Sequence, residues 1–297
     1  MKIISVFVLA AHLLAMNLAS AGPLACVWME WRGRRQHPET GTASLVARLA
    51  WHAWYALIAG VLLGLLLGWL DWVRGDRLVT ILPAFSRKLA WGIAEIACSI
   101  AWTGLYCGWL SWRPPQTGLA RAMHRSLAIL SATNLLYHFP ILLRVLSKAA
   151  HGQIQLPHEP ITAAHFRLWA FQPDVVAQAV HFALASIAVT GVYVLICGGA
   201  NEVWRRHAAR AALAASLLQI PVGVWLLAHL PEQAQLLGGS IPSAVAFGTS
   251  IVLAFSLMHH LAAASFGETD RPQIRRIAAL LLLTVLCMTA TLRLPHN

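Results

Sequence analysis

The chain has 297 residues, of which 58% are apolar and only 11% are charged, against about 25% charged residues in an ordinary soluble domain. This composition, with a mean hydropathy of +0.64, excludes a disordered chain, argues against a water-soluble globule and predicts an all-α protein that crosses a membrane several times. The net charge of +11 fits loop Lys and Arg that orient membrane helices and meet lipid headgroups, so we expect a lipid bilayer and no nucleic acid as partner.

Eight apolar segments are long enough, or nearly long enough, to cross a bilayer, which takes about 20 residues. In chain order they are Ile3–Met29, Leu49–Leu70, Leu89–Trp112, Leu127–Leu143, Val175–Cys197, Ala211–Leu230, Ile241–Phe266 and Ile277–Leu292. The fourth and eighth are short, and we expect them to extend into their flanks. The runs are continuous rather than alternating, which argues against barrel strands. We therefore predict a single integral membrane domain over residues 1–297, a polytopic transmembrane helix bundle of about eight helices.

The first segment has some features of a secretory signal. Lys2 precedes an apolar stretch that ends in a cleavage-like Ala19-Ser20-Ala21. The apolar character continues through Gly22-Pro23 to Met29, however, which makes the segment long enough to span. We predict a retained helix, kinked at Gly22-Pro23, and the alternative is a cleaved signal that leaves seven helices.

Loop charges predict the orientation of the bundle. Lys and Arg are more frequent in the loops after the first, third, fifth and seventh segments than on the other side. By the positive-inside rule, both termini then lie outside and these loops are cytoplasmic. The longest loop, residues 147–173, is external on this topology and carries His151, His158 and His165, as a functional loop or a partner-docking surface would. We expect the protein in a bacterial inner (cytoplasmic) membrane.

The histidines inside the apolar segments form two groups by depth. The outer candidates are His138 with His181, with His12 as a substitute, and the inner candidates are His52 with His259 or His260. Neutral imidazoles on neighbouring helices can ligate the iron of a b-type haem, and two such haems would carry electrons across the membrane. The alternative is that these histidines are interfacial, hydrogen-bonded and without a cofactor. The five cysteines include no CxxCH, which excludes covalent c-type haem attachment.

Glu95 is the one carboxylate well inside an apolar segment. Such a group is a candidate proton relay, quinone ligand or cation site. The alternative is a structural partner for a buried histidine or for Arg144. Asn17 and Asn134 are expected to form interhelical hydrogen bonds, and the row of Gly60, Gly64 and Gly68 predicts close helix packing.

The start of the chain resembles two families of eight-helix membrane proteins. His12-Leu-Leu-Ala, followed by the small residues Ser20-Ala21-Gly22 and then aromatics, is similar to the first helix of the CopD-type copper-resistance family and of the membrane domain of PuuD-type urate oxidases. Where those families carry a Trp-x-Gly-Gly string, this sequence has the stretch from Asn17 to Pro23. The resemblance implies an eight-helix protein that, like b-type cytochromes, carries intramembrane histidines.

These observations favour a membrane electron-transfer subunit with one or two b-type haems bound by histidine pairs. It would exchange electrons with a quinone or an external cytochrome such as cytochrome c, with Glu95 handling the coupled proton. As an enzyme component it would be the haem b membrane subunit of an oxidoreductase complex, beside partner redox subunits. The alternative is a secondary transporter or metal-ion permease that uses the histidines and Glu95. A third alternative is a structural subunit that binds no cofactor.

Overall fold

The protein is an all-α helix bundle, as its composition predicts. The computed structural model describes residues 2–36, 42–75, 77–112, 114–157, 161–198, 201–229, 240–267 and 269–293, and no strand occurs among them. The helices are α1 (Lys2–Gln36), α2 (Thr42–Val73), α3 (Arg77–Ile81), the 3₁₀ turn η1 (Leu82–Phe85), α4 (Ser86–Trp112), α5 (Gly118–Thr133), the π turn η2 (Asn134–His138), α6 (Phe139–Ala150), α7 (Ala163–Ala170), α8 (Pro173–Cys197), α9 (Glu202–Ala228), α10 (Ile241–Phe266) and α11 (Arg271–Arg293).

Eight spans in the described residues are long and apolar enough to cross a membrane, which confirms the predicted polytopic bundle. The fourth predicted segment extends on both sides into a span over Gly118–Ala150, and the eighth extends to Arg271–Arg293. Large apolar side chains such as Leu65, Trp91 and Val252 are exposed on the outside of the bundle. An exposed apolar surface of this extent suits lipid rather than water, so the protein is an integral membrane protein.

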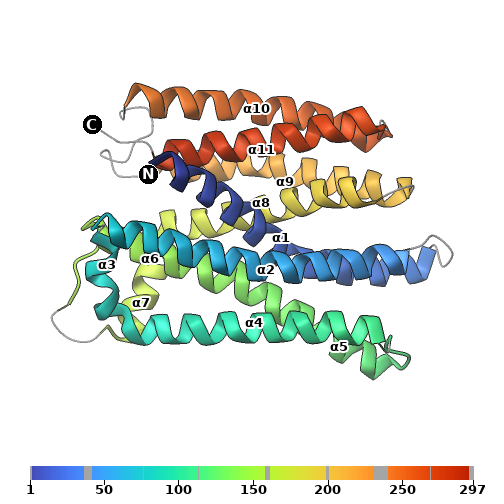
Figure 1. Ribbon diagram of the computed structural model, residues 1–297, viewed down its shortest axis with the longest axis horizontal. Helices are drawn as coiled ribbons and strands as arrows, with labels where there is room; N and C mark the ends of the chain where they lie inside the picture. The colour runs from blue at the N-terminus through green and yellow to red at the C-terminus, as the bar shows by residue number, and fades with distance from the viewer. Residues whose placement is uncertain are drawn as a thin grey trace.

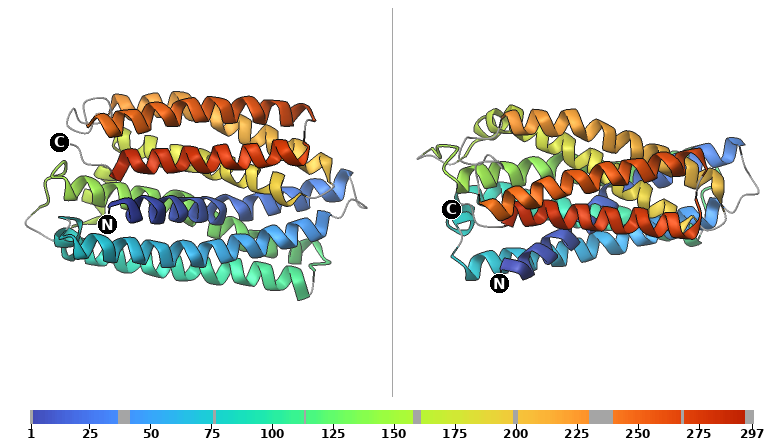
Figure 2. Two further views of the ribbon diagram at one scale, coloured as in Figure 1. Left: turned by 45° about the horizontal axis from the view of Figure 1, so that its top comes forward. Right: turned by 90° about the horizontal axis from the view of Figure 1, so that it is seen from above.

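The bundle is built from helix pairs that are consecutive in the chain. α1 packs on α2, α8 on α9 and α10 on α11, while α1 also packs against α5, α8 and α11 and so joins the pairs (Figure 1). α10 lies at one edge of the bundle and α4 at the other, and the long helices run roughly side by side (Figures 1 and 2). α1 begins and α11 ends at the same end of the bundle, as an even number of spans requires.

α1 continues as one helix through Gly22-Pro23 and past the predicted end at Met29 to Gln36. Small residues let it approach α2 closely. A Cβ added at Gly22 would lie 2.8 Å from the Cβ of Ala53, and one at Gly60 would lie 2.5 Å from the Sδ of Met16. Close packing at Gly60 and Gly64 is thus confirmed, whereas a Cβ at Gly68 would meet nothing within 4 Å.

The fourth span is interrupted by a π turn that the sequence analysis did not predict. η2 lies between α5 and α6 and ends two residues before Pro140. Proline has no N–H and its ring clashes with the carbonyl four residues earlier, here that of Leu136, and a wider turn relieves both conflicts. The extra residue in the turn changes which side chains of this span face α4.

The expected long loop over residues 147–173 is partly helical. α6 runs to Ala150 and α7 occupies the second half of the segment. Trp169 and Ile154 are buried in an apolar cluster with Phe85 and Val175, so the described part of this segment packs onto the end of the bundle. The apolar residues of α7 are the physical reason, since an open loop would leave them in water. His158 lies outside the described residues.

Candidate functional site

Two predicted site residues, Glu95 and His138, are in direct contact. Nδ1 of His138, at the end of η2, lies 2.7 Å from Oε1 of Glu95 on α4. The Glu95 side chain is 28% exposed and that of His138 47%, so the pair is at a half-open surface of the bundle. A short contact between a carboxylate and an imidazole is either an N–H···O⁻ hydrogen bond or, when the ring is protonated, an ion pair. Of the two partners considered for Glu95, a histidine and Arg144, the carboxylate contacts a histidine.

Beside this pair, polar side chains join α4 to α5 and η2. We call these groups, Ser99, Thr103, Ser131 and Asn134, the α4–α5 polar seam. Nδ2 of Asn134 donates to the backbone oxygen of Glu95 and to Oγ of Ser99, both at 2.8 Å. Oγ of Ser131 donates to the Ser99 carbonyl at 3.2 Å and lies 2.7 Å from Oγ1 of Thr103. These interhelical bonds fix the height and rotation of η2, and hence the place of His138 relative to Glu95.

The two other outer histidines lie on helices that meet at the same level. His12 on α1 has its Nδ1 2.8 Å from the carbonyl oxygen of Gly60 on α2. His181 on α8 has a buried Nδ1 without a hydrogen-bond partner among the described residues. An apolar cluster joins these helices to η2, and it contains Met16, Leu57 and Leu135 with Phe139 and Phe182 packed against it. The elements that carry His12, His138 and His181 therefore meet at this apolar cluster.

The inner histidines do not come together in the same way. His52 on α2 is exposed and its ring contacts Tyr193 of α8, with ring centroids 5.7 Å apart. His259 and His260 contact each other on α10, which packs against α9 and α11 at the edge of the bundle (Figure 1). Among the described residues, no group of three or more His, Cys, Asp or Glu side chains is placed to hold a metal ion.

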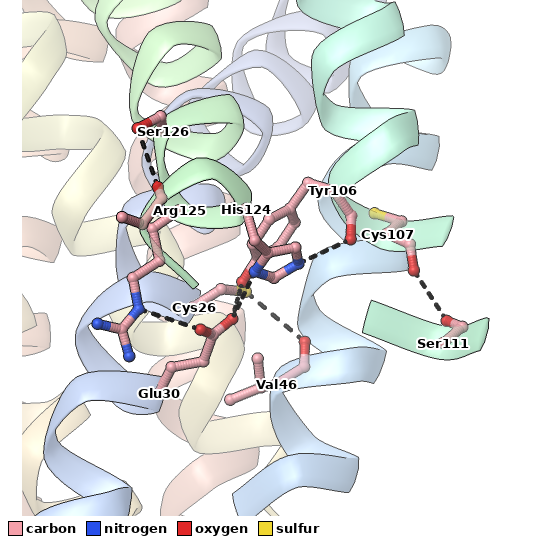
Figure 3. Close-up of polar contacts among 10 residues, drawn as sticks. Cys26, Glu30, Val46, Tyr106, Cys107, Ser111, His124, Arg125 and Ser126 are labelled. Atoms are coloured by element: carbon pink, nitrogen blue, oxygen red, sulfur yellow. Dashed lines mark hydrogen bonds and ion pairs between the residues drawn. The ribbon is translucent and has the colours of Figure 1, made fainter. Parts of the chain in front are cut away.

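A second cluster, which the sequence analysis did not predict, surrounds Glu30 near the end of α1 (Figure 3). The Tyr106 hydroxyl of α4 donates to Oε1 of Glu30 at 2.6 Å, and Nε of Arg125 of α5 donates to Oε2 at 3.3 Å. His124 stacks on the Tyr106 ring, with centroids 4.2 Å apart and an interplanar angle of 24°. Its Nε2 lies 3.1 Å from the Tyr106 carbonyl oxygen and its Nδ1 lies 3.8 Å from Oε1 of Glu30.

The Glu30 cluster is more enclosed than the Glu95–His138 pair. The side chain of His124 is fully buried and that of Glu30 is 9% exposed. The thiols of Cys26 and Cys107 are buried beside it, and Sγ of Cys26 donates to the Val46 carbonyl at 3.6 Å. The predicted first segment ends at Met29, one residue before Glu30, and the predicted fourth segment begins at Leu127, after His124. The aromatic residues on either side of Glu30, Trp28 and Trp31, could have indicated that α1 continues.

Glu95 is less buried than two further carboxylates, both paired with cations at the end of the bundle where α1 begins. Asp174 of α8 accepts from Arg144 at 2.9 Å and from Lys148 at 2.6 Å. Arg144, the other partner considered for Glu95, is therefore engaged elsewhere. Asp71 of α2 accepts from Arg293 at 2.9 Å. These ion pairs tie helix ends together.

Comparisons with known proteins assign no family. The chain matches no protein-family model, and no curated protein is significantly similar to it. The resemblance of the first helix to the CopD-type and PuuD-type families stays a prediction.

Proposed function

We propose that the protein is a membrane electron-transfer subunit that binds a b-type haem through histidines at the level of Glu95. The observation that carries this proposal is the 2.7 Å contact between Nδ1 of His138 and the Glu95 carboxylate. Metal-ligating histidines commonly donate one ring N–H to a carboxylate or a carbonyl, which fixes the tautomer and leaves the other nitrogen for the metal. In His138 this other nitrogen is Nε2.

His12 and His181 are the candidates for the second ligand. Nδ1 of His12 donates to a backbone carbonyl, which likewise leaves Nε2 available. His181 offers a buried ring nitrogen that has no hydrogen-bond partner in the described residues. Such a nitrogen is costly to bury unless something else satisfies it, and an iron ligand bond or the hydrogen bond of a bound ligand would do so.

Haem supplies one-electron chemistry when it is bound, and the chain supplies orientation and charge. In this proposal Glu95 holds His138 in place and accepts its Nδ1 proton as the local charge changes. The electron partners are a quinone or an external cytochrome, and the setting is a bacterial inner membrane. The first haem of the proposal is the one at the outer group, and a second haem held by His52 with His259 or His260 stays a prediction.

The test is an optical spectrum of the detergent-purified full chain, oxidised and then reduced, with a pyridine haemochromogen assay for stoichiometry. We expect a b-type signal that is lost in His138→Ala and in either His181→Ala or His12→Ala. His151→Ala is the matched control, because His151 is exposed and its Nδ1 lies 2.7 Å from the carbonyl oxygen of Ser147 in the preceding helix. A colourless protein from cells supplied with haem, or full haem content in all three variants, would overturn the proposal.

One observation favours a second function, a proton-coupled or metal-ion transporter. The Glu95–His138 pair lies at a π turn next to Pro140, and transporters often place their sites at interrupted helices. A haem-free protein that moves protons or divalent cations into liposomes, with the flux abolished in Glu95→Gln, would support this function in place of electron transfer.

A further inference from the structure

An apolar groove of about 290 Å³ lies between α1, α8 and α11. Its lining includes Leu18 of α1, Val192 and Tyr193 of α8, and Ala278 and Leu282 of α11. The groove opens to the surface of the bundle, since Leu282 is 46% exposed. Its origin is the path of α1, which begins beside α11 and crosses toward α2 (Figure 1). This path leaves α8 as the floor between α11 and the pair of α1 and α2.

Arginines lie near the end of the groove where α8 ends and α11 begins. Arg275 precedes Ala278 by three residues and Leu282 by seven, so the three side chains share one face of α11. Arg275 is thus about one helical turn closer to the end of the bundle than the groove lining. It is exposed and forms no hydrogen bond or ion pair within the described residues. On the α2 side, the exposed Arg48 donates from Nη2 to the carbonyl oxygen of Cys197, the last residue of α8, at 3.3 Å.

Two acidic residues at this end of the bundle are already engaged. Oδ1 of Asp270 accepts a hydrogen bond from the backbone N–H of Gln273 at 2.9 Å and so caps the start of α11. The Glu30 carboxylate accepts from Arg125. Neither acid is paired with Arg275. An apolar groove that ends in a positively charged mouth fits an amphiphile with an anionic head.

We propose that this groove binds an anionic phospholipid, with an acyl chain against Val192 and Leu282 and the phosphate at Arg275 and Arg48. Phosphate oxygens accept strong charge-assisted hydrogen bonds from guanidinium groups. The tail of a quinone would also suit the apolar lining, but its uncharged head would leave the arginines without a partner. The site is formed by other helices than the Glu95–His138 pair and needs no haem, so it does not depend on the proposed function.

The experiment measures lipid binding to the detergent-purified full chain by native mass spectrometry, in separate titrations with phosphatidylglycerol and phosphatidylcholine. We expect one phosphatidylglycerol per chain to bind more tightly than phosphatidylcholine. Arg275→Gln should weaken phosphatidylglycerol binding about fivefold, the effect of one arginine near an anionic headgroup, and leave phosphatidylcholine binding unchanged. Arg276→Gln is the matched control, because Arg276 is also exposed but lines a different cavity, together with Glu202 and Asp270.

The apolar part of the site is tested by Leu282→Trp, which fills the groove and should weaken the binding of both lipids. The arginine comparison decides alone if this variant does not fold. The proposal is overturned if the wild-type chain binds the two lipids equally, or if Arg275→Gln and Arg276→Gln weaken phosphatidylglycerol binding to the same extent. Unchanged lipid binding in a folded Leu282→Trp would also overturn it. Displacement of the lipid by glycerol 3-phosphate would identify a site for a soluble phosphate instead.

Discussion

The protein contains two carboxylate–histidine pairs that differ in what surrounds them. Glu95 and His138 are 2.7 Å apart and partly exposed, whereas Glu30 and His124 are 3.8 Å apart and enclosed. Glu30 is also bound by the phenol of Tyr106 and by the guanidinium of Arg125, which neutralises its charge. The open pair, Glu95–His138, is accessible to a ligand or a proton. The closed pair, Glu30–His124, also holds three helices together.

The largest expected difference is in stability. Arg125→Ala should destabilise the protein by about 2–4 kcal/mol, because it leaves the Glu30 carboxylate in an enclosed site without its cation. The measurement is the thermal unfolding of the detergent-solubilised variant. Arg121→Ala is the control one turn earlier on α5, where the side chain bonds only to the exposed Gln116 carbonyl. If Arg125→Ala and Arg121→Ala lost the same amount of stability, the Glu30 cluster would not be more tightly coupled than the Glu95–His138 pair.

A smaller effect is expected for the residue that connects the polar seam to Glu95. Asn134→Ala removes the two interhelical bonds to α4 and should destabilise the protein by about 1–2 kcal/mol, given the modest strength of such bonds in bilayers. It should also disturb His138, because η2 loses its link to α4. Ser126→Ala is the control, since its hydroxyl bonds within α5 to the Ala122 carbonyl. If Asn134→Ala and Ser126→Ala unfolded at the same temperature, the polar seam would not be what holds η2 in place.

The smallest stability effect is expected at the open pair itself. Glu95→Gln should change the unfolding free energy by less than about 1 kcal/mol, because partly exposed ion pairs contribute little. Its effect should instead appear in the haem spectrum or reduction potential under the proposed function, or in ion flux under the alternative. A loss of stability as large as that of Arg125→Ala would contradict the distinction between an open and a closed pair.

The sequence pointed to the residues of the open pair but not to those of the Glu30 cluster. Glu95 is a charged residue in an apolar run, and His138 lies in another such run, so each stood out as costly to bury. Asn134 was expected to form interhelical bonds, and it does so with α4. Glu30 was missed because the hydropathy pattern ends one residue earlier, although the helix continues to Gln36. His124 was missed for a related reason, because it precedes the predicted fourth segment, whereas the span itself begins at Gly118.

The sequence by itself determined the class of protein and the number of spans. Only a helix satisfies every backbone group in lipid, and a run of about 20 apolar residues is sufficient to specify one. The tertiary structure decided which polar groups meet. That depends on the rotation of each helix and on the π turn before Pro140, which follow from side-chain packing between segments far apart in the chain. Hydropathy depends only on local composition, so it identified the helices but not the pairs Glu95–His138 and Glu30–His124.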